Sequence, residues 1–385
     1  MMSEDYVLKV KNLKVNFYTY EGVVKALDGV QLRLKRGDTM GIVGETGCGK
    51  SVTARSILRL VEPPGRIEEG EVLFYDKNLE TGEVTEIDIL KLSDEEMLHI
   101  RGNKIAIVFQ DPATFPNPVF KVGDQIAEVI EIHQDLGRDA LEVKIEELEQ
   151  ALKADPPAEK AAQIEERIRE YKAMLDNPPE PDKKYRKKAA LRRAIEMLRM
   201  VKMPAPEQIA NQYPHELSGG MRQRALIAMA LACNPSILIC DEATTALDVT
   251  VQAQVLSLLN DLKKKVGSSI MIITHDLGVV AETCNAVTVM YAGTTVEATS
   301  TEELFNNPIH PYTVGLLKAV PKLHEHKDRL DQIRGSVPNL ITPPTGCRFH
   351  PRCDFATEIC SKEKPELREM RPGHWVACHH PQGKI

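Results

Sequence analysis

The stretch GETGCGKS, residues 44–51, decides the fold of this 385-residue chain. It fits the spacing G-x4-G-K-[ST], follows a short apolar run at residues 40–43, and precedes a segment, 51–60, whose apolar residues recur at helical spacing. In that setting the glycines let backbone N–H groups converge on phosphate oxygens, and the helix N-terminus adds partial positive charge. The sequence therefore predicts a phosphate-binding loop, or P-loop, between a buried strand and a helix.

The side chains of this loop predict a nucleotide triphosphate and a magnesium ion as its ligands. Lys50 supplies a full charge between the β- and γ-phosphates, and the Ser51 hydroxyl is a hard oxygen ligand for Mg²⁺. The residues expected at ATP are Gly44, Glu45, Thr46, Gly47, Cys48, Gly49, Lys50, Ser51 and Val52.

Two carboxylates follow a second apolar run, residues 237–240. Successive side chains of a strand point to opposite faces, so Asp241 and Glu242 cannot serve the same purpose. We expect Asp241 to join Ser51 at Mg²⁺. Glu242 would then act as the general base on a water in line with the γ-phosphate.

Further apolar runs alternate with helical stretches, which predicts a parallel sheet covered on both faces. The runs at 105–109 and 270–274 are followed by Gln110 and His275, and neither residue by itself indicates a function. Before the P-loop, residues 7–18 and 31–35 have strand composition.

Composition excludes several classes of protein. The chain is 42% hydrophobic and 27% charged, which suffices for a sizeable core. Its apolar runs are far shorter than the roughly 18 residues that a membrane span needs, and its N-terminus lacks signal-peptide features, so we expect neither secretion nor a transmembrane helix. The net charge of −7 argues against a nucleic-acid partner. Four scattered cysteines are expected to be reduced and buried: Cys48, Cys233, Cys240 and Cys284.

One charged stretch, residues 138–193, interrupts the alternation. Leu141, Ile145, Leu148 and Leu152 recur at helical spacing, and the same spacing returns from residue 164 to residue 175. Prolines stop both segments. The pattern predicts an inserted antiparallel helical hairpin with a narrow apolar seam, either a solvated structural insertion or an arm that docks a partner.

The tetrapeptide LSGG, residues 217–220, lies shortly before the strand that carries the two carboxylates, and here the chain resembles the ABC-transporter ATPases. The resemblance implies an α/β P-loop NTPase fold with a RecA-like core, an antiparallel β subdomain and a helical subdomain. It identifies Gln110 with the Q-loop glutamine, which is also expected near Mg²⁺. It identifies residues 246–248 with the D-loop and His275 with the switch histidine. Tyr20, or else Tyr18, is placed like the aromatic residue that stacks on adenine.

The resemblance also implies that one chain holds only part of each site. In this family the signature closes on ATP held by the opposite subunit, so that two ATP molecules join a head-to-tail dimer. The residues implied in that role are Ser218, Gly219, Gly220 and Asp248.

The tail carries a narrower resemblance. NPIHPYT, residues 307–313, and GCRFHPRC, residues 346–353, are similar to the C-terminal region of oligopeptide/dipeptide importer ATPases. We therefore expect an ATPase domain at 1–300 and a C-terminal region at 301–385. Two departures from the family pattern, Ala243 and Cys48, remove no ligand.

The implied protein powers peptide uptake from the cytoplasmic face of the membrane. Its implied partners are two transmembrane permease subunits, an extracytoplasmic substrate-binding protein and a second ATPase, which in the family's peptide systems is generally a paralogue. Related systems import oligosaccharides or metal chelates, so the substrate class stays open. A soluble ABC ATPase of DNA repair would need long coiled coils between P-loop and signature, and a translation factor would need two cassettes.

The last four cysteines, Cys347, Cys353, Cys360 and Cys378, follow the spacing C-x5-C-x6-C-x17-C. They lie in a proline-rich tail that needs a cross-link or metal to fix it. Wide spacing and the family resemblance predict a [4Fe–4S] cluster with a structural role. Zinc is the alternative, because nearby histidines could replace a cysteine: His350, His374, His379 and His380.

Overall fold

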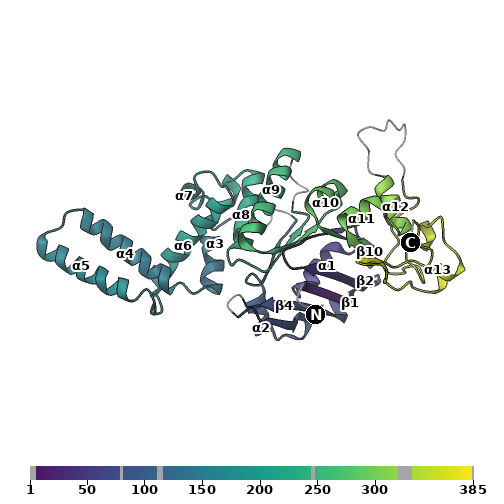
Figure 1. Cartoon of the computed structure of the whole chain (residues 1–385), viewed down its shortest axis with the longest axis horizontal. Helices are drawn as coiled ribbons and strands as arrows, with labels where there is room; N and C mark the ends of the chain where they lie inside the picture. The colour runs from purple at the N-terminus through teal and green to yellow at the C-terminus, as the bar shows by residue number, and fades with distance from the viewer. Residues whose placement is uncertain (1–5, 79–80, 111–115, 244–247, 320–331, 384–385) are drawn as a thin grey trace.

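The computed structural model describes residues 6–78, 81–110, 116–243, 248–319 and 332–383. The molecule is elongated, with a helical hairpin at one end and the C-terminal tail at the other (Figure 1). The nucleotide-binding residues predicted above lie on the elements between these two ends.

The central sheet has the order β11-β12-β10-β9-β3-β8-β7-β6 among the described residues. Its middle strands pair in parallel, as the alternating sequence pattern predicts, and the strands from β10 onward pair antiparallel. The parallel strands are β3 (Thr39–Val43), β6 (Ile105–Val108), β7 (Ile237–Asp241), β8 (Ser269–Ile273) and β9 (Ala286–Tyr291). The antiparallel ones are β10 (Thr294–Ser300), β11 (Arg368–Arg371) and β12 (His374–Val376).

A second sheet is wholly antiparallel and packs over helix α1 (Lys50–Ile57). Its strands, in the order β2-β1-β4-β5, are β1 (Tyr6–Thr19), β2 (Gly22–Lys35), β4 (Gly65–Lys77) and β5 (Val84–Asp88). One apolar cluster joins it to the central sheet, because Leu8 and Phe74 of the second sheet share that cluster with Ile42 and Ile239. The P-loop therefore emerges between two packed layers.

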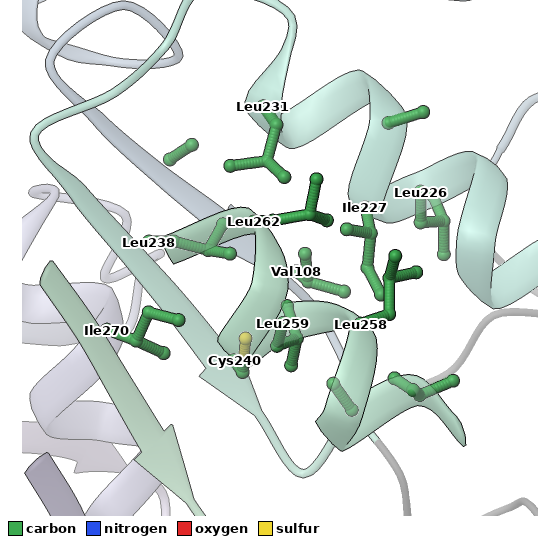
Figure 2. Close-up of a cluster of buried hydrophobic side chains, with 14 of the residues drawn as sticks. Val108, Leu226, Ile227, Leu231, Leu238, Cys240, Leu258, Leu259, Leu262 and Ile270 are labelled. Atoms are coloured by element: carbon green, nitrogen blue, oxygen red, sulfur yellow. The ribbon is translucent and has the colours of Figure 1, made fainter. Parts of the chain in front are cut away.

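Helices cover the other face of the central sheet. Leu226 and Ile227 of α8 (Gly219–Leu231) and Leu259 of α9 (Val249–Val266) pack toward Val108 and Leu238 of the sheet (Figure 2). Helix α6 (Lys183–Met200) packs in turn on α3 (Val122–His133) and α8. The shorter elements are α2 (Asp94–Ile100), α7 (Pro206–Ile209), α10 (Leu277–Thr283), η1 (Ile89–Lys91), η2 (Pro214–Glu216) and η3 (His350–Arg352).

A helical hairpin is present as predicted, but it is shorter than residues 138–193, because residues 183–193 belong to α6 on the body. Helices α4 (Gly137–Lys153) and α5 (Ala158–Ala173) lie antiparallel and extend away from the body (Figure 1). Ile145, Ile164 and Ile168 form a small buried cluster between them, and Leu148, Leu152, Tyr171 and Leu175 pack against it. Within the described residues, no helix is both long and apolar enough to cross a membrane.

The tail is built onto the central sheet. It contains α11 (Thr301–Asn306), α12 (Pro311–Lys318) and α13 (Glu358–Lys362), and its strand β12 pairs with β10, with Ala298 opposite Trp375. The guanidinium of Arg33 lies 3.6 Å from the Trp375 ring centre. The central sheet thus continues without interruption from the main body into the tail.

Candidate nucleotide-binding site

The P-loop has a backbone that only glycine can follow at its first position. Gly44 has φ +153°, and a Cβ there would lie 2.1 Å from the Met290 carbonyl oxygen. Gly49, with φ +98°, is the N-cap of α1, so that the helix begins directly at Lys50. The loop therefore delivers the helix N-terminus to its concave side, as a phosphate site requires.

Lys50 is buried and points back into the loop. Its Nζ donates to the carbonyl oxygens of Gly44, at 2.8 Å, and Glu45, at 3.2 Å. Burial raises the pKa of the neighbouring Cys48 thiol, so this thiol stays neutral. The loop thus offers one fixed cation and no competing anion from Cys48.

Ser51 and Asp241 meet as predicted, although they are far apart in sequence. The Ser51 hydroxyl donates to Asp241 Oδ1 at 2.8 Å. Burial raises the pKa of the Asp241 carboxyl, and the Ser51 hydrogen bond partly offsets that shift. Two hard oxygen donors side by side beside a phosphate loop fit Mg²⁺, whose charge would also stabilise the buried carboxylate.

Gln110, Glu242 and His275 converge from the ends of three neighbouring strands. Gln110 Nε2 donates to Glu242 Oε2 at 2.8 Å, and His275 Nδ1 lies 3.8 Å from Glu242 Oε1. Glu242 has φ +47°, an unfavourable conformation for a side chain with a Cβ, and its carboxylate contacts Gln110 and lies near His275, whereas that of Asp241 contacts Ser51. The arrangement can hold a carboxylate as a base, hydrogen-bonded by Gln110 at one oxygen and close to His275 at the other.

The residues expected to act on a second subunit are placed differently. Ser218 is exposed, and its hydroxyl accepts from Met221 N, which caps α8. Asp248 is exposed and caps α9 in the same way. The rest of the proposed D-loop, residues 246 and 247, lies outside the described residues.

Tyr20 lies in the turn between β1 and β2 and is fully exposed. Tyr18, the second candidate, donates its hydroxyl hydrogen to Glu68 at 2.8 Å. An aromatic ring without packing partners is available for stacking on a base, so the geometry favours Tyr20 over Tyr18.

Sequence reasoning missed the tail residues that contact the P-loop. Arg352 forms a two-pronged ion pair with Glu45, at 2.7 and 3.1 Å, and the Tyr312 hydroxyl accepts from the Glu45 N–H at 2.9 Å. Some 300 residues separate these partners, and no local pattern in the sequence links them.

The four tail cysteines are brought together, but not into a metal geometry. Cys347, Cys353, Cys360 and Cys378 line one small cavity, together with His350, His379 and His380. Burial raises the pKa of Cys347 to about 11 and of Cys378 to about 12. In the part of the chain that the structure describes, no group of three or more His, Cys, Asp or Glu side chains is positioned to hold a metal ion. The predicted [4Fe–4S] region is therefore not supported as an observed site.

Comparison with known families divides the chain where the tail begins. Residues 27–245 match the ABC transporter family, and residues 296–360 match the oligopeptide/dipeptide transporter C-terminal region. The first match holds the P-loop, the signature and the two carboxylates; the second holds Tyr312, Arg352 and three of the four cysteines.

Curated proteins are similar over nearly the whole length. One is named as a probable peptide ABC transporter ATP-binding protein of Sinorhizobium fredii, 46% identical over 97% of this chain and 95% of that protein. The oligopeptide transport ATP-binding protein OppD of Bacillus subtilis is 42% identical over 96% of this chain and 87% of its own length. Among solved structures, a dimeric ATP-binding cassette bound to ADP and phosphate after hydrolysis is 26% identical, covers 76% of this chain and 98% of its own, and has a TM-score of 0.52.

Proposed function

Because the chain belongs to the ABC transporter family and carries its oligopeptide/dipeptide-type C-terminal region, we propose that it is the ATP-binding and ATP-hydrolysing subunit of a peptide importer. The observation that carries the proposal is the convergence of Ser51 with Asp241, and of Gln110 and His275 with Glu242, at the end of the P-loop strand. A binding module without catalysis would not need a carboxylate held from two sides.

The residues divide the chemistry between binding and proton transfer. Lys50 and the loop N–H groups hold the phosphates, while Ser51 and Asp241 would hold Mg²⁺, which neutralises phosphate charge when bound. Glu242 accepts the proton of the attacking water, and Gln110 and His275 keep its carboxylate in line. His275 is half exposed, so it can also contact the γ-phosphate end of the site.

The Glu242→Gln variant tests the role of the general base. The amide keeps the hydrogen bond to Gln110 but cannot take a proton, so ATP still binds while turnover falls at least about a hundredfold. The matched control is Glu302→Gln, an exposed glutamate on α11. Hydrolysis by the assembled complex near the wild-type rate in the Glu242 variant would remove this residue from the role.

A complete site requires a second ATPase subunit. Ser218 and Gly219 are exposed at the start of α8, where N–H groups and the helix dipole favour an anion. They would close, with Gly220 and Asp248, on ATP held by the opposite P-loop. We expect the second subunit to be a paralogue, and mass analysis of the purified importer decides between one ATPase chain and two.

The other partners are two permease subunits and an extracytoplasmic substrate-binding protein, which place the chain peripherally on the cytoplasmic face of the membrane. The segment after Gln110 is expected to meet the permease. Val119 and Phe120, just before α3, are exposed apolar residues there. Cross-links from residues 110–125, of which 111–115 lie outside the described residues, to the permease would support this. Their absence in every nucleotide state would contradict it.

The tail cysteines are proposed to hold a [4Fe–4S] cluster. Four thiols lining one cavity form a donor set that suits an iron–sulfur cluster, and a bound cluster would take them as thiolates. Its role would be to fix the fold of the tail.

Anaerobic purification followed by iron, sulfide and zinc analysis tests this assignment. Iron and acid-labile sulfide that disappear in Cys360→Ser, but persist in the control Cys284→Ser, are expected. Cys284 is likewise buried but lies at the end of α10, outside the cysteine cavity. One zinc without sulfide would replace the cluster by a zinc site.

A further inference from the structure

The tail reaches the nucleotide site through a buried arginine. The side chain of Arg352 is 6% exposed, and both of its terminal nitrogens contact the carboxylate of Glu45 in the P-loop. Its Nε donates to the Arg334 carbonyl oxygen at 2.8 Å, so the guanidinium is also fixed on the tail side. A planar guanidinium held at both ends is a rigid link between the two regions.

Glu45 is fixed at all three of its polar groups. Arg352 holds the carboxylate, the Tyr312 hydroxyl accepts from the backbone N–H, and Lys50 Nζ donates to the carbonyl oxygen. Tyr312 itself is buried and packs against Tyr291, with ring centres 4.7 Å apart. The tail therefore sets the position of the residue on which the P-loop lysine rests.

A second tail arginine supports the far side of the same loop. Arg348, with its side chain 5% exposed, donates to the carbonyl oxygens of Ala292 and Lys25 and lies 3.4 Å from Asp28. Gly293, which follows Ala292 in the chain, donates its N–H to the Cys48 carbonyl oxygen of the P-loop at 2.8 Å. The two arginines thus support the loop near its start and near its end.

We infer that Arg352 is a positioning residue of the ATP site, which holds Glu45 and thereby keeps the P-loop in its phosphate-binding shape before nucleotide arrives. The inference rests on the proposed function and deepens it, since it makes the C-terminal region part of the nucleotide site. Two physical effects act together. The ion pair neutralises a carboxylate close to the triphosphate, and a preformed loop has less conformational entropy to lose on binding.

The experiment measures the affinity of the full chain for MgADP by calorimetry. Arg352→Gln should weaken binding about tenfold, a scale typical of a lost charge-assisted contact. Glu45→Gln should weaken binding by less than this, because it breaks the same contact but leaves no unpaired carboxylate near the phosphates. The double variant should be no weaker than the worse single variant, because both substitutions break the same contact. The control is Arg368→Gln, an exposed tail arginine, which should bind like wild type.

A positioning role also predicts how catalysis changes. In the assembled importer, both single variants should raise KM for ATP while kcat at saturating ATP stays within about twofold, because Glu242 and His275 are untouched. If Arg352→Gln fails to fold, Glu45→Gln still tests the link, since it leaves the tail hydrogen bonds of Arg352 in place.

Two results would overturn the inference. One is unchanged MgADP affinity in both single variants. The other is a loss in the double variant that equals the product of the two single-variant losses, which would mean that the two residues act separately. Failure of the wild-type chain itself to bind MgADP would instead count against the proposed function.

Discussion

The hairpin of α4 and α5 and the C-terminal tail are both additions to the nucleotide-binding body, but they are attached in opposite ways. Most of the hairpin packs on its own cluster of Ile145, Ile164 and Ile168, and only the start of α4 joins the main core, through Ala140 and Val143. The tail has strands in the central sheet, and its Tyr312 and Phe349 belong to the main core. The comparison indicates that an added segment influences the nucleotide site when its apolar residues join the main core and its buried charges contact the P-loop. The length of the added segment matters less.

The largest effect is expected at the tail anchor, Glu297. This residue is fully buried on β10; its carboxylate accepts from the N–H groups of Ile309 and His310 and contacts His374 Nε2 at 2.7 Å. Glu297→Ala leaves these N–H groups and the His374 ring nitrogen without their partner. The substitution should lower the global free energy of unfolding by about 3 kcal/mol. Denaturant unfolding checks this, with exposed Glu366→Ala as the control. A loss below about 1 kcal/mol would contradict the anchoring of the tail in the main fold.

A smaller and local effect is expected in the hairpin. Ile168→Ala removes part of the seam and should cost about 2 kcal/mol, felt as faster hydrogen exchange in α4 and α5 only. The affinity for MgADP should stay within about twofold of wild type. Exchange that rises equally in the central sheet, or a tenfold loss of affinity, would show that the hairpin is coupled to the body.

The smallest effect is a pH dependence of the tail anchor. Burial raises the pKa of the Glu297 carboxyl, but hydrogen bonds from His374, Ile309 and His310 together outweigh this effect and hold the pKa below its usual range. A carboxyl with a lowered folded pKa contributes stability above its unfolded pKa, near 4.3, and loses it as the pH falls further. Wild type should therefore lose more stability than Glu297→Gln between about pH 5 and pH 3. Parallel curves for the two proteins would contradict the lowered pKa.

Features that rest on local patterns could be predicted from sequence. The P-loop, the strand that ends at Asp241 and the seam of the hairpin each occupy one continuous stretch with a definite period or motif, and the structure has all three. The pairing of Ser51 with Asp241 also followed, because parallel strands bring their carboxyl ends to one edge.

Features that rest on long-range contacts could not be predicted. Arg352 is one polar residue among many in an irregular tail, and only the fold brings it to Glu45. The extension of the central sheet into the tail was missed for the same reason, since β11 and β12 are too short to give a period. The cysteine spacing predicted a [4Fe–4S] cluster; the four cysteines do line one cavity, but spacing alone does not fix the geometry of four thiols, and the described residues show no metal-holding group.

The central claim, that ATP turnover by this chain drives peptide import, is tested most directly by hydrolysis in the importer assembled in lipid vesicles. ATP turnover is measured with the permease and substrate-binding protein present, with and without short peptides. The account predicts that peptides stimulate hydrolysis and that Glu242→Gln abolishes the stimulated rate. Stimulation by oligosaccharides but not by peptides, or a rate indifferent to both, would contradict it.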